Sequence, residues 1–229
     1  MRIAVFAPLY NRTGINPRTD LPYADATGAF QPEGRAFVRH HGDGARLHLF
    51  DSSATPRERQ VQVTRVLDDY VDLDAVAFFC HGHKLGLQAG FDGAIGAEQL
   101  AQAIGTHRSI RTVVLYACDT GRDADNARND DLQEGPGGDG GFADLLRDDL
   151  VGTWARQATV FGHPQTGHTD QLPYVRRFGP TTHLGGEWII SPRDALWARW
   201  RRALHDADDS LRFDYPFLTQ EQIRSRLSR

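Results

Sequence analysis

The stretch Ala75-Val-Ala-Phe-Phe-Cys-His-Gly82 decides the fold, together with a second one, Thr112-Val-Val-Leu-Tyr-Ala-Cys-Asp-Thr-Gly121. Each begins with a short run of apolar, β-branched and aromatic residues, which is typical of a strand buried on both faces of a parallel sheet. Each run leads to a residue with a reactive side chain, His81 in the first and Cys118 in the second. Because functional groups of open α/β sheets collect at the carboxyl ends of the strands, the two stretches predict one sheet edge that carries both side chains.

Further strands and helices are expected on either side of these stretches. We expect strands over 3–8, 37–41, 46–51, 75–80, 111–117, 158–162 and 188–190, and helices over 56–70, 97–104, 142–157, 192–205 and 219–229. The strands over 37–41 and 46–51 are expected to form a hairpin, because Gly42-Asp-Gly44 between them is a strong turn signal. This order of elements predicts a three-layer α/β/α sandwich around a mainly parallel sheet of about six strands.

The helix expected over 56–70 has a clear start signal. Thr55 and Glu58 have the spacing of a capping box, with a proline at the first helical position. Its apolar residues predict a core face made of Val61, Val66, Leu67 and Tyr70.

Residues 1–229 are expected to form a single domain. Within it, the segment 121–141 is rich in acidic residues and glycine, which indicates a flexible loop. The last part of the domain, 191–229, is expected to be helical.

The bulk composition excludes several classes of protein. A net charge of −4 argues against a nucleic-acid-binding surface, which needs concentrated Lys and Arg. No apolar run approaches the roughly 18 residues of a transmembrane helix, and the apolar start of the chain is too short for a signal peptide. Two cysteines do not make a disulfide framework. We therefore expect a cytoplasmic protein with no membrane or nucleic-acid partner.

The two motifs resemble those of the caspase-like cysteine peptidases. His81-Gly82 after one strand and Ala117-Cys-Asp-Thr-Gly121 after the next are most similar to the metacaspases and the bacterial CHAT-type proteases. The resemblance covers roughly residues 1–165 by strand order, and it departs from the caspase signature at Tyr116, where caspases carry Gln. It implies a caspase-like sheet and a bacterial-type cysteine endopeptidase whose partner is a polypeptide substrate.

The chemistry of such a peptidase assigns roles to the motif residues. A thiolate attacks a peptide carbonyl, so Cys118 is the candidate nucleophile and His81 the candidate general acid and base. The resemblance implies that the backbone N–H groups of Gly82 and Cys118 hold the developing oxyanion. Cys80 precedes His81, and strand alternation turns it into the core. Its alternative role is an inhibitory redox pair with Cys118.

Charged residues near the motifs are candidates for substrate recognition. Asp119 and Asp92 would select a basic residue before the cleaved bond, whereas Arg176 and Arg177 would select an acidic one. Because Asp119 directly follows the nucleophile, the sequence favours a basic residue at that position.

Further histidines leave a second interpretation open. His163 and His168 follow the strand after the cysteine strand, and we expect them to line the substrate cleft. With His81 and His83 they would instead make a zinc site, so that a metal-dependent hydrolase is an alternative. The histidines match no established ligand spacing, and we assign no metal to the site.

The acidic segment 123–131 has two alternative roles. Calcium regulates some metacaspases, and the segment is a candidate calcium site, although it lacks the register of an EF-hand. Its position after the nucleophile also suits a self-processing zymogen, with Arg122 and Arg128 or the aspartates as cleavage sites. A solvated loop is the default interpretation.

A non-catalytic function also fits the sequence. Cys118 would then be a small buried apolar residue and His81 a hydrogen-bonded histidine at the end of a strand. The chain would in that case be a caspase-like module that binds a regulatory protein partner.

Overall fold

A computed structural model describes residues 1–9, 15–16, 21–22, 27–125, 137–165, 175–181, 185–206 and 210–229. The strands in these ranges are β1 (Ile3–Pro8), β2 (Ile15–Asn16), β3 (Leu21–Pro22), β4 (Ala45–Phe50), β5 (Ala75–Phe79), β6 (Gly82–His83), β7 (Gly86–Leu87), β8 (Phe91–Asp92), β9 (Thr112–Tyr116), β10 (Thr159–Gly162), β11 (Arg176–Phe178) and β12 (Glu187–Trp188). The helices are α1 (Thr27–His41), α2 (Pro56–Asp68), α3 (Gly93–Gly105), α4 (Phe142–Val151), α5 (Trp197–His205), α6 (Leu211–Asp214) and α7 (Gln220–Leu227), with short 3₁₀ turns at Gly42–Gly44 and Tyr215–Phe217.

One central sheet of seven strands organises the molecule, in the order β12-β11-β10-β9-β5-β1-β4. The five strands from β10 to β4 run parallel, and β11 and β12 add an antiparallel edge. Parallel neighbours need a crossover, and α1, α2, α3 and α4 supply one each between successive parallel strands. The strands β1, β5 and β9 are buried at every residue, as their apolar runs predict.

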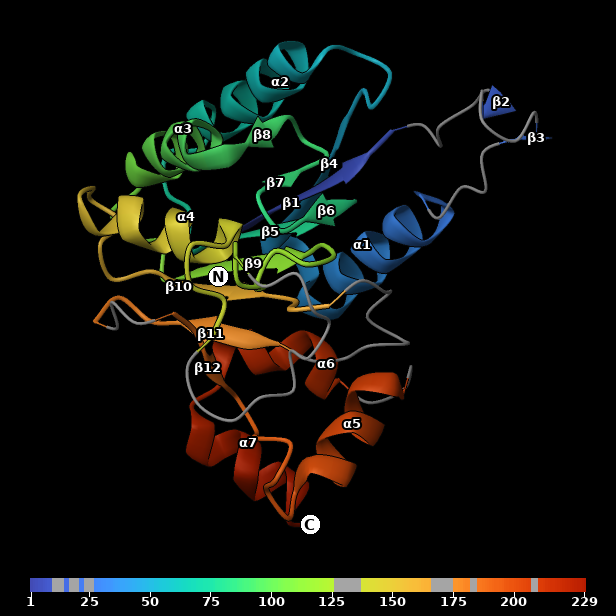
Figure 1. Cartoon of the computed structure of the whole chain (residues 1–229), viewed down its shortest axis with the longest axis vertical. Helices are drawn as coiled ribbons and strands as arrows, with labels where there is room; N and C mark the ends of the chain where they lie inside the picture. Colours follow the sequence, from blue (N-terminus) through green and yellow to red (C-terminus); the bar gives the residue numbers. More distant parts are fainter. Residues whose placement is uncertain are drawn as a thin grey trace.

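Two helical layers cover the faces of this sheet. One core cluster joins the sheet to α2, α3 and α4, and a second joins it to α1 and to the C-terminal helices α5, α6 and α7. In Figure 1 these two groups of helices lie on opposite sides of the strands. The expected three-layer α/β/α sandwich with a mainly parallel sheet is therefore confirmed. None of the helices in the described part of the chain is long and apolar enough to cross a membrane.

The expected hairpin over 37–41 and 46–51 is wrong. Residues 37–41 belong to α1, and β4 pairs in parallel with β1. Gly42 has a φ of +71°, so the Gly-Asp-Gly signal ends a helix there and does not turn a hairpin. Pro32 and Gly34 lie inside α1 and disfavour a helix by propensity, but buried Phe30 and Phe37 pack the helix onto the sheet.

The helix expected over 56–70 has the predicted start. Of its predicted core face, Val66, Leu67 and Tyr70 pack into the core, and only Val61 does not. Thr55 and Glu58 form the capping box. The fully buried residues are Val63 and Leu67, whereas Val61 is 58% exposed. Val63 and Leu67 are four residues apart and share one helix face, and Val61 lies outside it.

An ion-pair cluster ties the C-terminal helices to α1. The Asp214 carboxylate contacts His40 Nε2 of α1 at 2.6 Å and Arg226 Nη1 of α7 at 2.6 Å. Burial alone would raise the pKa of Asp214, but hydrogen bonds from His40 and Arg226 outweigh it and lower the pKa below its ordinary value. The carboxylate is thus one of the groups that hold the C-terminal layer in place.

We predict that Asp214→Asn lowers the free energy of unfolding by about 1–3 kcal/mol at neutral pH. A carboxyl with a depressed folded-state pKa contributes stability above its unfolded-state pKa, and the contribution disappears as the pH falls through the folded-state value. The difference between Asp214→Asn and the unmodified chain should therefore shrink below about pH 4. Urea unfolding at several pH values measures it, and a difference that stays constant with pH would contradict this assignment.

Candidate functional site

The pairing of β5 with β9 brings the two reactive residues to one edge of the sheet. The two strands are adjacent and parallel, and their last register pair is Phe79 with Tyr116. The two rings stack with centroids 4.4 Å apart. His81 and Cys118 each follow two residues after a member of this pair. They therefore leave the sheet at the same level, side by side at its carboxyl edge.

His81 is held by its backbone and by its ring. Its N–H donates to Gln88 Oε1 at 3.1 Å, and its carbonyl accepts the Gln88 N–H at 2.8 Å. Its imidazole meets the Phe30 ring of α1 edge to face, with centroids 4.9 Å apart. Phe30 is buried and His81 is partly exposed, so the imidazole lies at the boundary between the α1 layer and the surface.

Cys118 lies in a tight turn directly after β9. The Thr120 hydroxyl donates to the Ala117 carbonyl at 3.0 Å, and the Arg122 N–H donates to the Asp119 carbonyl at 3.1 Å. Asp119 has a φ of +57°, which non-glycine residues adopt at a cost and keep only where the surroundings hold them there. Cys118 forms no disulfide and is partly exposed. The turn thus presents a reactive group at the surface.

Gly82 packs directly on the turn formed by residues 117–122, which we call the cysteine turn. A Cβ atom at Gly82 would lie 2.6 Å from the Cys118 carbonyl oxygen and 2.8 Å from the Ala117 Cβ. Only a residue without a side chain allows this approach. The two motifs, distant in the sequence, are therefore in contact through their backbones.

Cys80 is a core residue. It is fully buried in the cluster beneath α2, α3 and α4, while the His81 ring lies on the α1 side. Burial raises the pKa of the Cys80 thiol to about 12, and nearby Cys118 contributes to the increase. The two cysteines are not joined in a disulfide. Of the two, only Cys118 is open to solvent.

The two candidate acids for substrate recognition each have a basic neighbour. Asp92 Oδ1 contacts His83 Nε2 at 3.0 Å on the small sheet β6-β7-β8, and Asp92 is 57% exposed. His83 Nδ1 also accepts the Leu85 N–H at 3.3 Å, so both of its ring nitrogens are engaged. Asp119 lies 3.9 Å from Arg122. Neither carboxylate is an isolated charge.

The candidate bases for an acidic substrate are also engaged. Arg176 is buried, and its guanidinium stacks 4.3 Å above the Trp188 ring and donates to the Gly186 carbonyl at 3.0 Å. Arg177 pairs with Glu187 at 3.2 Å.

The remaining candidates are placed only in part. His163 is 4% exposed, its ring centroid is 6.0 Å from that of Tyr116, and its carbonyl accepts the Gly121 N–H at 2.9 Å. Its side chain thus offers little surface to a substrate. His168, Arg128 and most of the acidic segment 123–131 lie outside the described residues. Within the ranges that the structure describes, no three His, Cys, Asp or Glu side chains come together as a metal site.

Sequence reasoning missed the groups that hold the two motif residues. Gln88 lies beside His81 because β6 and β7 pair as a hairpin that turns the chain back. The glycine-rich sequence over 82–96 is the signal that could have indicated this turn. Phe30 has no local signal, since its role depends on α1 being a helix. Lys84, the chain's one lysine, donates to the Ala124 carbonyl at 2.8 Å. It therefore connects the loop after His81 to the segment after Cys118.

Comparison of the chain with models of protein families, with curated proteins and with solved structures finds no match in any of the three. The assignment of a function therefore depends on the residues and geometry of this edge of the sheet.

We predict that Gly82→Ala lowers the free energy of unfolding by about 1–3 kcal/mol, because the new methyl group overlaps the cysteine turn. Gly152→Ala is the matched control, since a Cβ there lies 3.5 Å from its nearest neighbour, an ordinary contact. We expect that change to stay within about 0.5 kcal/mol. Urea unfolding of both variants measures the difference, and equal stabilities would show that the two motifs are not in contact.

Proposed function

We propose that this chain is a caspase-like cysteine peptidase in which Cys118 is the nucleophile and His81 the general acid and base. The observation that carries the proposal is the β5–β9 register, which gives both residues the same position beyond neighbouring central strands. Two further features support it. Cys118 is the solvent-accessible thiol of the pair of cysteines, and the backbone of Gly82 touches its turn.

The proposed reaction uses this chain's groups in two stages. His81 accepts the thiol proton as the Cys118 sulfur bonds to the peptide carbonyl carbon, and the carbonyl oxygen becomes an oxyanion. Donation from the N–H groups of Gly82 and Cys118 would stabilise this oxyanion, and one such donor is typically worth about 10²–10³ in rate. The carbon–nitrogen bond then breaks, and His81 returns the proton to the leaving amine. A water molecule deprotonated by His81 hydrolyses the thioester and frees Cys118.

The surroundings of His81 suit this role. Two hydrogen bonds with Gln88, one donated and one accepted by the His81 backbone, hold His81 on both sides, and the edge-to-face contact with Phe30 limits rotation of the imidazole. A base held in one orientation loses less conformational freedom when it meets the thiol and the leaving amine. Two cysteines without a disulfide also suit a reducing compartment such as the cytoplasm.

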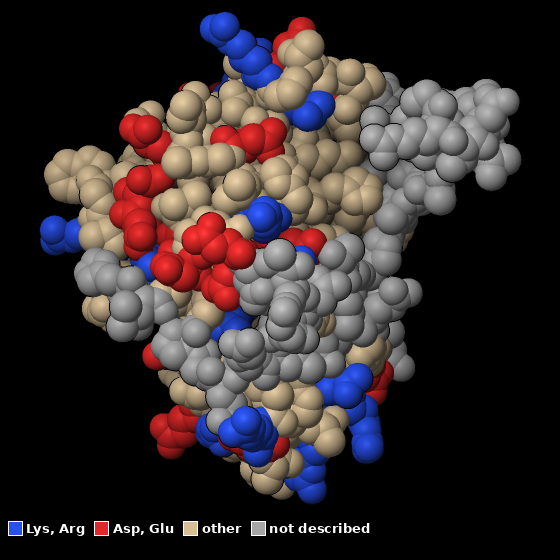
Figure 2. Space-filling view, viewed as in Figure 1, with Lys and Arg blue, Asp and Glu red and all other residues tan. Residues whose placement is uncertain are grey.

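Charge near the site favours substrates with a basic residue before the cleaved bond. Figure 2 shows acidic side chains gathered over α4 and the loop before it. Asp125, Asp139 and Asp148 are exposed on these segments, which adjoin the cysteine turn. A negative surface of this kind attracts Arg- or Lys-containing peptides, and Asp119 or Asp92 would exchange its present partner for the substrate cation.

The test combines thiol labelling with peptide hydrolysis. In the folded protein we expect iodoacetamide to label Cys118 and leave Cys80 unlabelled, because burial protects Cys80. A library of peptides with basic residues should be cleaved, and Cys118→Ala should abolish cleavage. His81→Asn should lower kcat/KM by about 10²–10⁴.

Cys80→Ala is the control, since it removes the other thiol and should retain cleavage. Cleavage that survives in Cys118→Ala would overturn the proposal. Cleavage that a chelator stops and zinc restores would instead support the metal-dependent alternative. Absence of any cleavage, with an unreactive Cys118, would favour a non-catalytic binding module.

A further inference from the structure

A short segment before α4 packs against residues 121–124, which follow Cys118. We call residues 137–141 the stem. The Ala124 N–H donates to the Asp139 carbonyl of the stem at 3.0 Å. A Cβ atom at Gly138 would lie 2.5 Å from the Gly121 carbonyl oxygen, and one at Gly141 would lie 2.0 Å from that of Arg122. The stem thus touches the two residues that end the cysteine turn.

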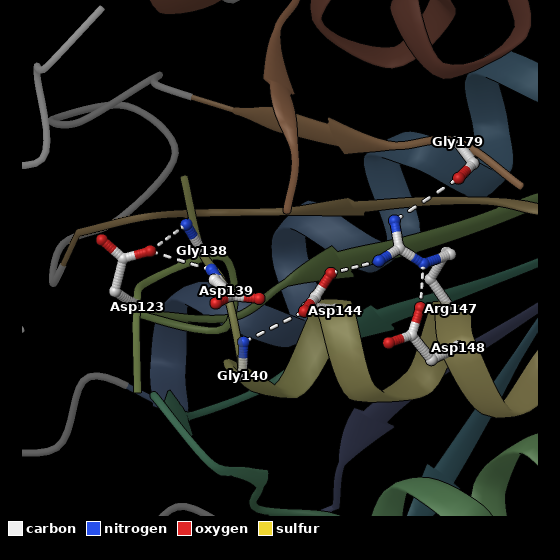
Figure 3. A network of polar contacts seen from close by, with 8 residues as sticks. All are labelled: Asp123, Gly138, Asp139, Gly140, Asp144, Arg147, Asp148 and Gly179. Carbon is white, nitrogen blue, oxygen red and sulfur yellow. Dashed lines mark hydrogen bonds and ion pairs between the residues drawn. The ribbon is translucent and has the colours of Figure 1, made fainter. Parts of the chain in front are cut away.

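Two carboxylates bind three successive backbone N–H groups of the stem. Asp123 Oδ1 accepts the N–H groups of Gly138 and of Asp139, the latter at 2.8 Å, and Asp144 Oδ2 accepts the Gly140 N–H at 3.0 Å. Figure 3 shows the two side chains on either side of the stem, Asp123 from the chain after the cysteine turn and Asp144 from α4. Hydrogen bonds to an ionised acceptor are stronger than neutral ones. The stem is therefore held by charged groups from both neighbours.

Arg147 fixes the second of these carboxylates. Its guanidinium pairs with Asp144 Oδ1, contacts Asp148 Oδ1 at 2.5 Å and donates to the Gly179 carbonyl at 3.4 Å (Figure 3). Arg147 is 1% exposed and Asp144 3% exposed. Burial raises the pKa of Asp144 to about 6, against the Gly140 N–H and Arg147, so Asp144 is ionised at neutral pH and above. Buried charges persist only when they are paired, and this pair anchors the stem to the segment beyond β11.

α4 and the residue that follows β10 also contact the backbone of the cysteine turn. The first turn of α4 donates to it, from the Ala143 N–H to the Thr120 carbonyl at 2.8 Å. The Gly121 N–H donates to the His163 carbonyl at 2.9 Å. Asp119 keeps a φ of +57° only while its surroundings hold it. Its own N–H donates to the Gln165 carbonyl at 3.2 Å, and the stem and α4 hold the three residues that follow it.

We propose that Asp123 and Asp144 are positioning residues, forming a carboxylate latch that keeps the cysteine turn in the shape that presents the Cys118 thiol to His81. The latch acts on the turn through the backbone of residues 120–122. The inference rests on the proposed function for its purpose. The effect of the two carboxylates on the reactivity of the Cys118 thiol can be tested without a substrate.

The test compares Asp123→Ala with Asp125→Ala in the full chain. Both remove one acid from the same segment, but Asp125 is exposed and lies outside the latch. The readout is the rate of Cys118 alkylation by iodoacetamide as a function of pH, from pH 7 upward. A thiol paired with a base reacts with a midpoint below that of a free cysteine, about 8.5. We expect Asp123→Ala to raise the midpoint by about one unit and to slow alkylation at pH 7 about tenfold, while Asp125→Ala matches the unmodified chain.

A profile of Asp123→Ala that coincides with that of Asp125→Ala would overturn the latch. If Asp123→Ala does not fold, Asp123→Asn keeps one acceptor oxygen, and its midpoint must lie between those of the unmodified chain and of a free cysteine. Asp144→Asn should shift the profile in the same direction, whereas Asp149→Asn on the same helix should not. A shifted profile in a chain that cleaves no peptide would support the latch and reject the peptidase. Peptide cleavage with an unshifted profile would support the peptidase and reject the latch.

Discussion

The parallel pairing of β5 with β9 is the constraint on which the rest of this molecule depends. Both strands are buried at every residue, so their register is fixed by the core on both faces, and the stacked rings of Phe79 and Tyr116 mark its last step. A slip by one residue would turn these rings to the opposite face. Because the register cannot slip, the residues that follow the two strands meet at one edge.

The candidate site lies where the two helical layers reach that edge. His81 takes its support from the α1 layer through Phe30, and from the small sheet through Gln88. The cysteine turn takes its support from the opposite layer, through the first turn of α4. The two reactive residues thus take part of their support from different layers, and the backbone of Gly82 lies against the cysteine turn. Among the described residues, the proposed nucleophile and the proposed base are therefore held by different sets of contacts.

Two cysteines at neighbouring strand ends have contrasting environments. Cys80 faces the core, where burial disfavours its thiolate, and Cys118 lies in a turn that opens to solvent. The proposed peptidase needs one reactive thiol and no competing one, and this arrangement provides it. The proposed latch adds a reason for the buried charges of α4, since Asp144 and Arg147 sit beneath the turn that carries the nucleophile.

The sequence by itself determined the layered architecture, the strands β1, β5, β9 and β10, the capped start of α2 and the placement of His81 and Cys118 at one edge of the sheet. Apolar runs report burial directly, and parallel strands deliver their carboxyl ends to the same side. It did not reveal α1, whose proline and glycines oppose a helix until Phe30 and Phe37 find the sheet. Only the tertiary structure decided that Gln88 and Phe30 contact His81, and that the carboxylates of Asp123 and Asp144 bind the backbone of residues 138–140. Their contacts join segments far apart in the chain, and a local pattern records which residues are buried but not which of them meet.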